Sequence, residues 1–370
     1  MRAQRTCSQP RRTPVVSPKS SRPITSQRIM EVMEPLNAPS NPSQRRLAIA
    51  LGDPAGIGAE VTLKALASGA PEAEAPLLVG CRRWLEQRYS ELRQLEVGPL
   101  RDPAELELLD LPLAEPVLAG VSTPASGHAS FEWLTAATET VQQGLCHALV
   151  TAPIAKASWH AAGHRYPGQT ERLAELAGRP HASMLFTARS PRGTWRLNTL
   201  LATTHIPLAE VPRKLDHTLI EHKLDVLLEF CRRFSPQPHL VVAGLNPHAG
   251  EGGQLGREEA DWLESCLETW RAAHPDVNLT GPVPPDTCWL GAAEAWWGTG
   301  DGPDGYLALY HDQGLIPVKL LAFDAAVNTS LGLPFLRTSP DHGTGFAIAD
   351  RGIARSASMA AALETAWTLG

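Results

Sequence analysis

The stretch LAIALGDPAGIG, residues 47–58, decides the fold of this chain. Residues 47–51 form an apolar run of strand length, and the glycine-rich turn at 52–58 leads into a helical pattern. Such turns let the backbone approach a ligand closely and present a helix N-terminus to an anion. They also occur as plain tight turns, and this spacing matches neither a dinucleotide fingerprint nor a P-loop. Both interpretations of the turn stay open.

The same alternation of apolar runs and helical segments continues toward the C-terminus. It predicts further strands at residues 76–80, 146–151, 182–187, 195–203, 239–244 and 305–310. It predicts helices at residues 128–144, 219–233 and 257–273. The helix at 219–233 carries an apolar stripe, which we interpret as core or subunit interface. Strands that alternate with helices indicate the α/β class.

Charge is distributed unevenly along the 370 residues, whose formal net charge is −6. Residues 1–46 carry nine Lys or Arg and two Glu, and residues 47–370 are therefore strongly acidic, with a net charge of −13. An acidic body argues against nucleic acid as a partner. We expect residues 1–46 to be a disordered basic extension, with a transit peptide or a later start as alternatives.

The cysteine spacing and the length of the apolar runs indicate the cellular compartment. The six cysteines are scattered without a CxxC pair, which favours neither a disulfide framework nor a thiolate zinc site. No apolar run approaches the ~18 to 20 residues that span a bilayer. We therefore predict a cytoplasmic protein with no membrane partner.

Three histidines follow predicted strands directly. His205 follows LNTLLATT, His248 follows HLVVAGLNP, and His311 follows GYLALY. The carboxyl edge of an open α/β sheet is where ligands bind. Three imidazoles with an open position would suit a divalent metal ion. With thirteen histidines in the chain, ordinary surface or packing roles remain the alternative.

The block after His311 is densest in candidate residues. Lys319, Asn328 and Arg337 lie in mostly apolar sequence and are followed by DHGTG at residues 341–345. A partly buried cation needs a partner. That partner is either an internal carboxylate or the phosphate or carboxylate of a ligand.

Several longer motifs identify a family. They are GDPAGIG (52–58), TAPIAK (151–156), PGQTE (167–171), ATTHIPL (202–208), GLNPHAGEGG (244–253), GPVPPDT (281–287), YHDQGL (310–315) and VNTSLGLPFLRTSPDHGT (327–344). From residue 47 to the C-terminus the chain resembles the 4-hydroxythreonine-4-phosphate dehydrogenase family of vitamin B6 biosynthesis. The basic extension lies outside the resemblance.

The resemblance implies two α/β/α domains similar to those of isocitrate and isopropylmalate dehydrogenases. Residues 47–150 plus 316–370 would form the nucleotide side, and residues 151–315 the metal and dimer side. The active site would lie in the cleft between the domains, at the interface of a homodimer with shared active sites.

The resemblance also implies the site residues. One divalent ion per subunit (Zn, Mg, Co or Mn) would be held by His205, His248 and His311. The substrate would be contacted by Gln169, Thr170, Lys319, Asn328 and Arg337. NAD or NADP would lie near His342, Gly343, Thr344 and Gly345. The general base is open among Asp312, Asp286 and a metal-bound water, and the catalytic set comprises the three histidines, Lys319 and Asp312.

The implied reaction is oxidation of the 3-hydroxyl of 4-phosphooxy-L-threonine, followed by decarboxylation to 3-amino-2-oxopropyl phosphate, in pyridoxal 5'-phosphate biosynthesis. Gln169 stands where the family usually has His, and it keeps a hydrogen-bond donor but does not titrate near neutral pH. Three alternatives remain: the same chemistry on a related acid such as 4-phosphothreonate, a metal-dependent hydrolase of small phosphoesters, and a non-catalytic metabolite-binding protein.

Overall fold

A computed structural model describes residues 45–69 and 76–370. The expected extension, residues 1–46, lies outside the described residues except for its last two. Arg46 is already buried, and it forms an ion pair with Glu107 and accepts a hydrogen bond at its carbonyl from the backbone of His147. Arg45 donates from Nη1 to the Trp367 carbonyl at 3.2 Å, so both arginines contact the body of the protein.

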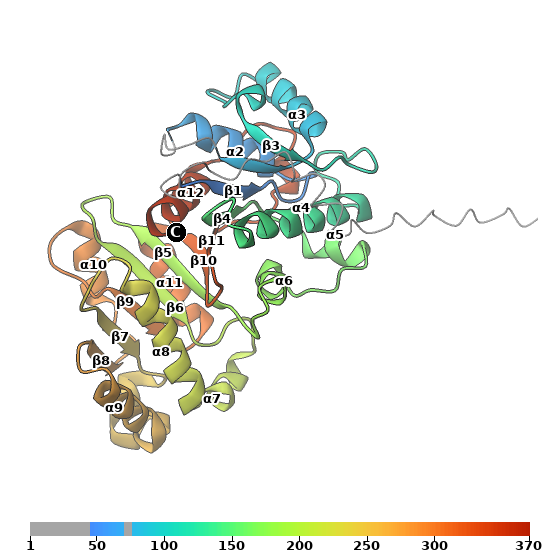
Figure 1. The fold of residues 1–370 in the computed structure, drawn as a ribbon. Helices are drawn as coiled ribbons and strands as arrows, with labels where there is room; N and C mark the ends of the chain where they lie inside the picture. The colour runs from blue at the N-terminus through green and yellow to red at the C-terminus, as the bar shows by residue number, and fades with distance from the viewer. Residues whose placement is uncertain (1–44, 70–75) are drawn as a thin grey trace, which may run out of the picture.

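The described strands form one mixed sheet in the order β3-β2-β1-β4-β11-β10-β5-β6-β9-β7-β8 (Figure 1). Their bounds are β1 Leu47–Ala50, β2 Leu77–Gly80, β3 Glu107–Asp110, β4 Ala148–Thr151, β5 Ser183–Arg189, β6 Arg196–Leu201, β7 His239–Ala243, β8 Asn278–Val283, β9 Gly305–Ala308, β10 Val327–Leu331 and β11 Leu336–Pro340. The seven predicted strands are all present and the α/β class is confirmed.

Four strands were not predicted: β3, β8, β10 and β11. The last two form an antiparallel hairpin at the centre of the sheet, and β10 also pairs antiparallel with β5. Their sequences, VNTSL and LRTSP, are polar at several positions, so they lack the apolar run by which the other strands are recognised. This hairpin carries Asn328 and Arg337 into the middle of the sheet.

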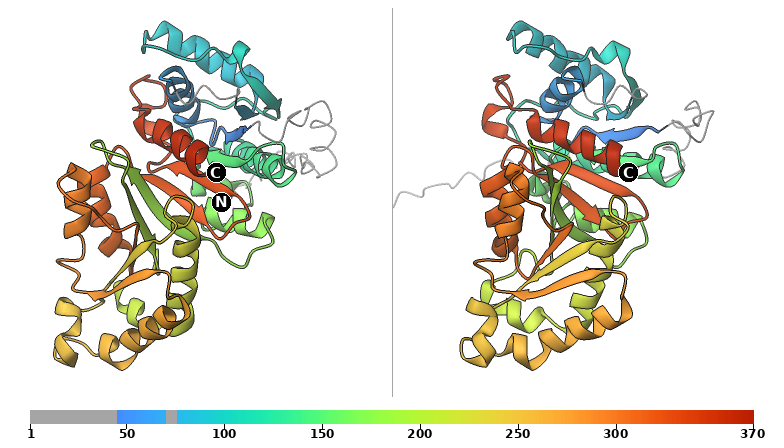
Figure 2. Two further views of the ribbon diagram at one scale, coloured as in Figure 1. Left: turned by 60° about the vertical axis from the view of Figure 1, so that its left-hand side comes forward. Right: turned by 90° about the vertical axis from the view of Figure 1, so that its left-hand side faces the viewer.

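Helices cover both faces of the sheet. Their bounds are α2 Gly58–Ala67, α3 Arg82–Gln94, α4 Pro124–Gln142, α5 Lys156–Ala161, α6 Gln169–Leu176, α7 Val211–Lys214, α8 His217–Cys231, α9 Glu264–Ala273, α10 Leu290–Trp297, α11 His311–Ala322 and α12 Ala357–Leu369. The predicted helix at 257–273 begins as a π-helical segment, Glu259–Leu263, and continues as α9. Helices α8 and α11 lie on opposite faces of the sheet (Figure 2). No helix in the described residues has the length and apolarity needed to cross a membrane.

The apolar stripe of α8 belongs to the core of this chain. Ile220, Leu224 and Leu227 are fully buried and pack within the main hydrophobic cluster. This settles the open choice between core and subunit interface in favour of the core. The exposed apolar stripe lies instead on α11, where Leu320 is 80% exposed and Ile316 and Phe323 lie about one turn to either side.

The glycine-rich turn at residues 52–58 is buried and serves packing. A Cβ on Gly52, whose φ is +73°, would lie 2.4 Å from the carbonyl oxygen of Pro153. A Cβ on Gly56 would lie 2.7 Å from the carbonyl oxygen of Thr344. The Ile57 amide donates to that same carbonyl at 2.9 Å. The turn therefore holds the DHGTG loop, residues 341–345, against the first strand and helix.

Candidate active site

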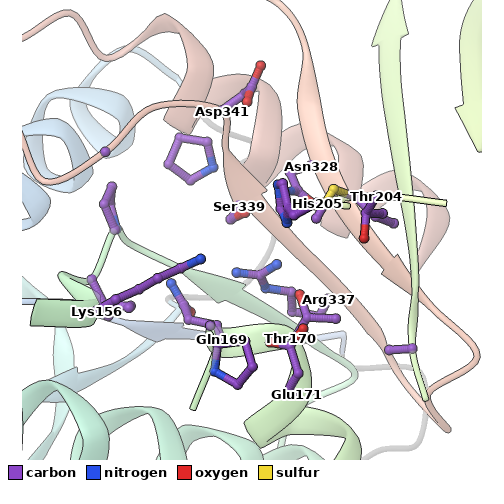
Figure 3. Close-up of a pocket in the computed structure, with 18 of the residues that line it drawn as sticks. Lys156, Gln169, Thr170, Glu171, Thr204, His205, Asn328, Arg337, Ser339 and Asp341 are labelled. Carbon is purple, nitrogen blue, oxygen red and sulfur yellow. The ribbon is translucent and has the colours of Figure 1, made fainter. Parts of the chain in front are cut away.

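A cavity of about 590 Å³ opens where the central hairpin meets the turns after β4 and β6 (Figure 3). Its polar lining comprises Lys156, Gln169, Thr170, Glu171, Thr204, His205, Lys223, Asn328, Arg337, Ser339, Asp341 and His342. A second hollow of about 580 Å³ shares Met184, His205, Asn328 and Asp341 with it and reaches His311, Asp312 and Lys319 on α11. The two form one groove, and all five predicted substrate residues line it.

Arg337 is a buried cation at the centre of this groove, and its residue is only 3% exposed. Its Nε and Nη2 atoms donate to Thr151 Oγ1 at 3.0 and 2.6 Å, and Nη1 donates to Ser330 Oγ at 3.3 Å. Among the described residues it forms no ion pair with a carboxylate. Burial lowers the pKa of Arg337 to about 10, which the negative charge of Glu171 partly opposes. A charge desolvated in this way is stabilised when an anion binds.

Polar groups around Arg337 converge on the same space. Figure 3 shows the side chains of Lys156, Gln169 and Arg337 pointing toward one another. Gln169 is the first residue of α6, so the positive end of that helix dipole also faces the cavity. Gln169 Nε2 donates to the Ala152 carbonyl at 3.3 Å. Lys156 was not singled out from sequence, although it ends the motif TAPIAK.

Three buried polar atoms in the cavity wall have no hydrogen-bond partner within the part of the chain that the structure describes. They are Gln169 Oε1, Asn328 Oδ1 and His342 Nε2. Unpaired buried polar atoms are rare and costly in folded proteins. Their gathering around one cavity, beside an uncompensated guanidinium, indicates a site completed by a polar ligand.

Lys319 has a different environment. Its Nζ atom forms an ion pair with the carboxylate of Asp341, and Asp341 is fixed through its amide, which donates to Ser358 Oγ at 3.0 Å. Of the two partners that the sequence left open for a buried cation, Lys319 has the internal carboxylate. Arg337 has none among the described residues and keeps its charge for a ligand.

The three predicted histidines follow three neighbouring parallel strands. His205 lies beyond β6, His311 begins α11 after β9, and His248 lies beyond β7, with β9 paired to both other strands. The His205 and His311 rings lie 5.3 Å apart between centroids. Burial lowers the pKa of His205, and the nearby His311 and Lys156 lower it further. A neutral imidazole is the form that binds metal ions.

His248 is exposed and does not line the groove. Its loop, Pro247–Gly253, is left-handed from residue 248 to residue 252, with His248 at φ 53°. Left-handed backbone at non-glycine residues costs energy and persists only where surroundings enforce it. The buried Glu259 fixes the chain just before this loop: Oε1 accepts from the Leu245 and Asn246 amides at 2.7 and 2.8 Å, and Oε2 accepts from the Asn246 side chain at 2.8 Å.

Two residues of the YHDQGL motif hold the His311 turn. Gln313 is buried, accepts from the Leu309 amide at 2.7 Å and donates to the Gly244 carbonyl at 2.6 Å, which ties the ends of β9 and β7 together. Asp312 Oδ1 lies 2.8 Å from His311 Nδ1. A carboxylate on one ring nitrogen fixes the tautomer and leaves the other nitrogen free for a ligand. Glu259 and Gln313 are positioning residues that sequence reasoning missed.

The described chain does hold one compact group of three metal-ligating side chains, and it lies elsewhere. His217, Glu221 and Cys266 have donor atoms all within 4.8 Å of one another, between α8 and α9. Burial raises the pKa of the Cys266 thiol to about 11 and so disfavours the thiolate that binds metal. The predicted trio His205, His248 and His311 does not form such a compact group.

The predicted cofactor residues occupy the loop after β11. His342 and Gly343 line the cavity, whereas Thr344 and Gly345 pack against Ile57 of the glycine-rich turn. Lys223 was also missed. It lies in the middle of the apolar stripe of α8, and a lone lysine among stripe positions is the signal that could have found it.

An α/β fold whose carboxyl strand edge carries imidazoles, a buried uncompensated cation and unpaired polar atoms defines an enzyme-like site for a small anionic metabolite. Residues 72–366 match the family model described as pyridoxal phosphate biosynthetic protein PdxA. The chain belongs to the PdxA family, and the resemblance predicted from its motifs is confirmed.

Related proteins match this chain along nearly their whole length. A protein of Synechococcus sp. strain RCC307, named 4-hydroxythreonine-4-phosphate dehydrogenase, is 64% identical over 328 residues, covering 88% of this chain and 99% of that protein. The D-threonate 4-phosphate dehydrogenase of Pectobacterium atrosepticum is 37% identical over 336 residues, covering 87% and 98%. The crystal structure of the 4-hydroxythreonine-4-phosphate dehydrogenase of Klebsiella pneumoniae matches with a TM-score of 0.76 and 37% identity, covering 89% and 99%.

Proposed function

We propose that this chain is an NAD- or NADP-dependent oxidoreductase that oxidises the 3-hydroxyl of 4-phosphooxy-L-threonine and releases CO2, leaving 3-amino-2-oxopropyl phosphate for pyridoxal 5'-phosphate biosynthesis. The observation that carries the proposal is Arg337, a buried guanidinium without a carboxylate partner among the described residues, in a cavity that also presents unpaired atoms of Gln169 and Asn328. The names of the relatives supply the substrate.

In this proposal the predicted substrate and cofactor residues of the groove have binding roles. Arg337 holds an anionic end of the substrate with its fork of donors, and the α6 N-terminus with Gln169 and Thr170 adds hydrogen bonds to the same group. Asn328 orients the hydroxyl-bearing carbon, and Lys319, held by Asp341, lies along the α11 side of the groove. His342 and Gly343 contact the nicotinamide nucleotide.

The donor types after β6, β9 and β7 are those that suit a divalent ion: the His205 and His311 rings lie 5.3 Å apart between centroids, Asp312 leaves one nitrogen of His311 free, and His248 follows the neighbouring strand without lining the groove. His205, His248 and His311 would hold it. Such an ion supplies Lewis-acid polarisation of the substrate hydroxyl and of the ketone formed from it. Asp312 is the candidate base, with Asp286 as the alternative on the exposed loop before α10.

The chemistry balances in two steps. A hydride passes from C3 of the substrate to the nicotinamide, and the hydroxyl proton passes to the base. The loss of both converts the substrate into a 3-keto acid. The bond to the carboxylate carbon then breaks, CO2 departs, and the electron pair is protonated to give the amino-ketone. The substrate needs an anion site for its phosphate and a dry, oriented cavity for hydride transfer.

We also infer the predicted division into residues 47–150 plus 316–370 and residues 151–315, with the cavity between them. Support comes from the lining, since Gln169 and His205 belong to one segment and Asn328 and Arg337 to the other. The exposed stripe of Ile316, Leu320 and Phe323 beside the groove supports a homodimer whose interface adjoins the active site.

The decisive assay measures NADH formation with a divalent ion, on 4-phosphooxy-L-threonine and on 4-phospho-D-threonate in parallel. Preference for the first substrate by ~10-fold or more in kcat/KM supports the proposal. Preference for the threonate supports the second candidate, which Gln169 and the Pectobacterium relative favour. Phosphate release without NADH formation on either compound would identify a hydrolase instead.

A further inference from the structure

Lys223 is a buried lysine that the proposed mechanism does not use. It lies on α8, within the helix's apolar stripe, and its residue is only 9% exposed. Its Nζ atom donates to Ser183 Oγ at 2.8 Å. Across residues 45–69 and 76–370 no carboxylate forms an ion pair with it, whereas Lys64, another lysine of low exposure, is paired with Glu60 at 2.7 Å.

The Lys223 amine reaches the cavity past the ends of two central strands, at the start of β5 and the end of β6. Ser183 begins β5, and β6 ends beside it because the two strands are antiparallel, with Leu185 opposite Leu200. The residues after β6, Ala202 and Thr204, line the cavity together with Lys223. Helix α8 lies on the sheet face opposite α11. Lys223 therefore enters the site from the sheet face that α8 covers, at the turn between β6 and His205, whereas His311 and Lys319 enter it from the face that α11 covers.

An apolar residue would suit the buried stripe of α8 better than a lysine. An unpaired buried cation is destabilising, and burial lowers the pKa of Lys223 to about 8. A second cation of this kind, Arg337, lines the same cavity. An anion bound in the cavity would compensate both charges.

We propose that Lys223 binds an oxyanion of the ligand, either phosphate or carboxylate, as a second anion-binding group of this cavity beside Arg337. The inference rests on the proposed function for the substrate's two anionic ends, but not for the existence of the site. The protonated amine donates to the ligand oxygen while Ser183 holds it in place.

The test measures dissociation constants for sulfate and for malonate by calorimetry, on the full chain, at pH 7 and pH 9. Sulfate represents a phosphate, malonate a carboxylate, and the charge of both is constant over this range. Lys223→Met should weaken one of the two anions by ~10-fold or more at pH 7, and the anion affected identifies the group bound. Lys214→Met, at an exposed lysine on α7, is the matched control and should bind both anions like the wild type.

The pH arm separates the amine from its neighbours. The other titratable groups that line the cavity are Lys156, Glu171, His205, Arg337, Asp341 and His342. Wild-type affinity for the affected anion should fall by ~5-fold or more between pH 7 and pH 9, and Lys223→Met should lack this fall. Lys223→Gln, which removes the charge but keeps a donor for Ser183, is measured alongside as a second variant.

Unchanged binding of both anions in both variants would overturn the proposal. So would a loss of kcat with unchanged KM and unchanged anion binding, which would make the amine a general base. Failure of the proposed function is separate, because anion binding needs no turnover: wild-type protein that binds sulfate through Lys223 but forms no NADH would refute the reaction and keep the site.

Discussion

Arg337 on β11 donates twice to the hydroxyl of Thr151 at the end of β4, at 3.0 and 2.6 Å, across a parallel strand pair that joins positions 186 residues apart. The hydroxyl orients the guanidinium without neutralising it. The guanidinium therefore keeps its positive charge in the lining of the cavity, and the proposed function depends on this charge.

Arg337→Met is expected to raise the KM for the phosphorylated substrate by ~10- to 100-fold, since a charge-assisted hydrogen bond contributes roughly 1.5 to 3 kcal/mol. The fold should survive, because the variant removes an uncompensated buried charge. Arg196→Met is the control: Arg196 is also buried but pairs with Glu364 at 2.9 Å, so its loss should lower Tm and leave KM unchanged. Equal KM values for Arg337→Met and wild type would remove the anion site.

His205→Ala, His248→Ala and His311→Ala are each expected to abolish metal-dependent NADH formation and to lower the metal content of the purified protein. The reason is that three ligands are the minimum for a catalytic site of this kind. His217→Ala serves as control, since His217 belongs to the separate cluster with Glu221 and Cys266. A metal content that falls in His217→Ala but not in the variants of the predicted trio would contradict the assignment.

Gln169→His is expected to keep kcat/KM within ~5-fold, because both side chains donate a hydrogen bond from the first residue of α6. It should add a step near neutral pH to the rate profile, since histidine titrates there. Gln169→Leu should raise KM by ~10-fold through loss of the donor. A Gln169→His enzyme that gains a hundredfold would show that proton transfer, rather than binding, is the role of this position.

Lys223→Met is expected to stabilise the protein at neutral pH. The folded pKa of about 8 lies below the unfolded value of 10.5, so the unfolded chain binds more protons between these values and wild-type stability rises with pH. The gain from the substitution should therefore be about 3 kcal/mol at pH 7 and become small near pH ~10.5. Urea unfolding at both pH values measures it, and a gain that is equal at both would contradict the depressed pKa.

Leu320→Glu is expected to convert the proposed homodimer into monomers, because Leu320 is the most exposed residue of the apolar stripe on α11. Sedimentation equilibrium gives the mass. The control is Leu118→Glu, at an exposed leucine (70%) in the loop before α4, which should not change the assembly. A dimer that persists in Leu320→Glu would place the interface elsewhere.

Local patterns sufficed for the seven apolar strands and for helices such as α8, because burial of alternating or periodic apolar residues is recorded in neighbouring positions. They failed for β10 and β11, whose polar residues interrupt the apolar pattern, and three of these residues, Asn328, Arg337 and Ser339, line the cavity. Lys223 was missed for a related reason: the free-energy cost of burying its charge can be recognised only when the structure shows that this face of α8 is buried.

The sequence by itself determined the α/β class and the family, because strand patterns and motifs are contiguous in the chain. It also predicted Gln169, Asn328 and Arg337, which the structure brings to one cavity, but it missed Lys223 in the same lining. Only the tertiary structure decided which cation is neutralised: Lys319 meets Asp341, whereas Arg337 meets the hydroxyl of Thr151. It also decided that α8 is core and that α11 carries the exposed stripe. The physical reason is that the energy of a buried charge depends on its nearest neighbours in space, and strand order across the sheet sets those neighbours.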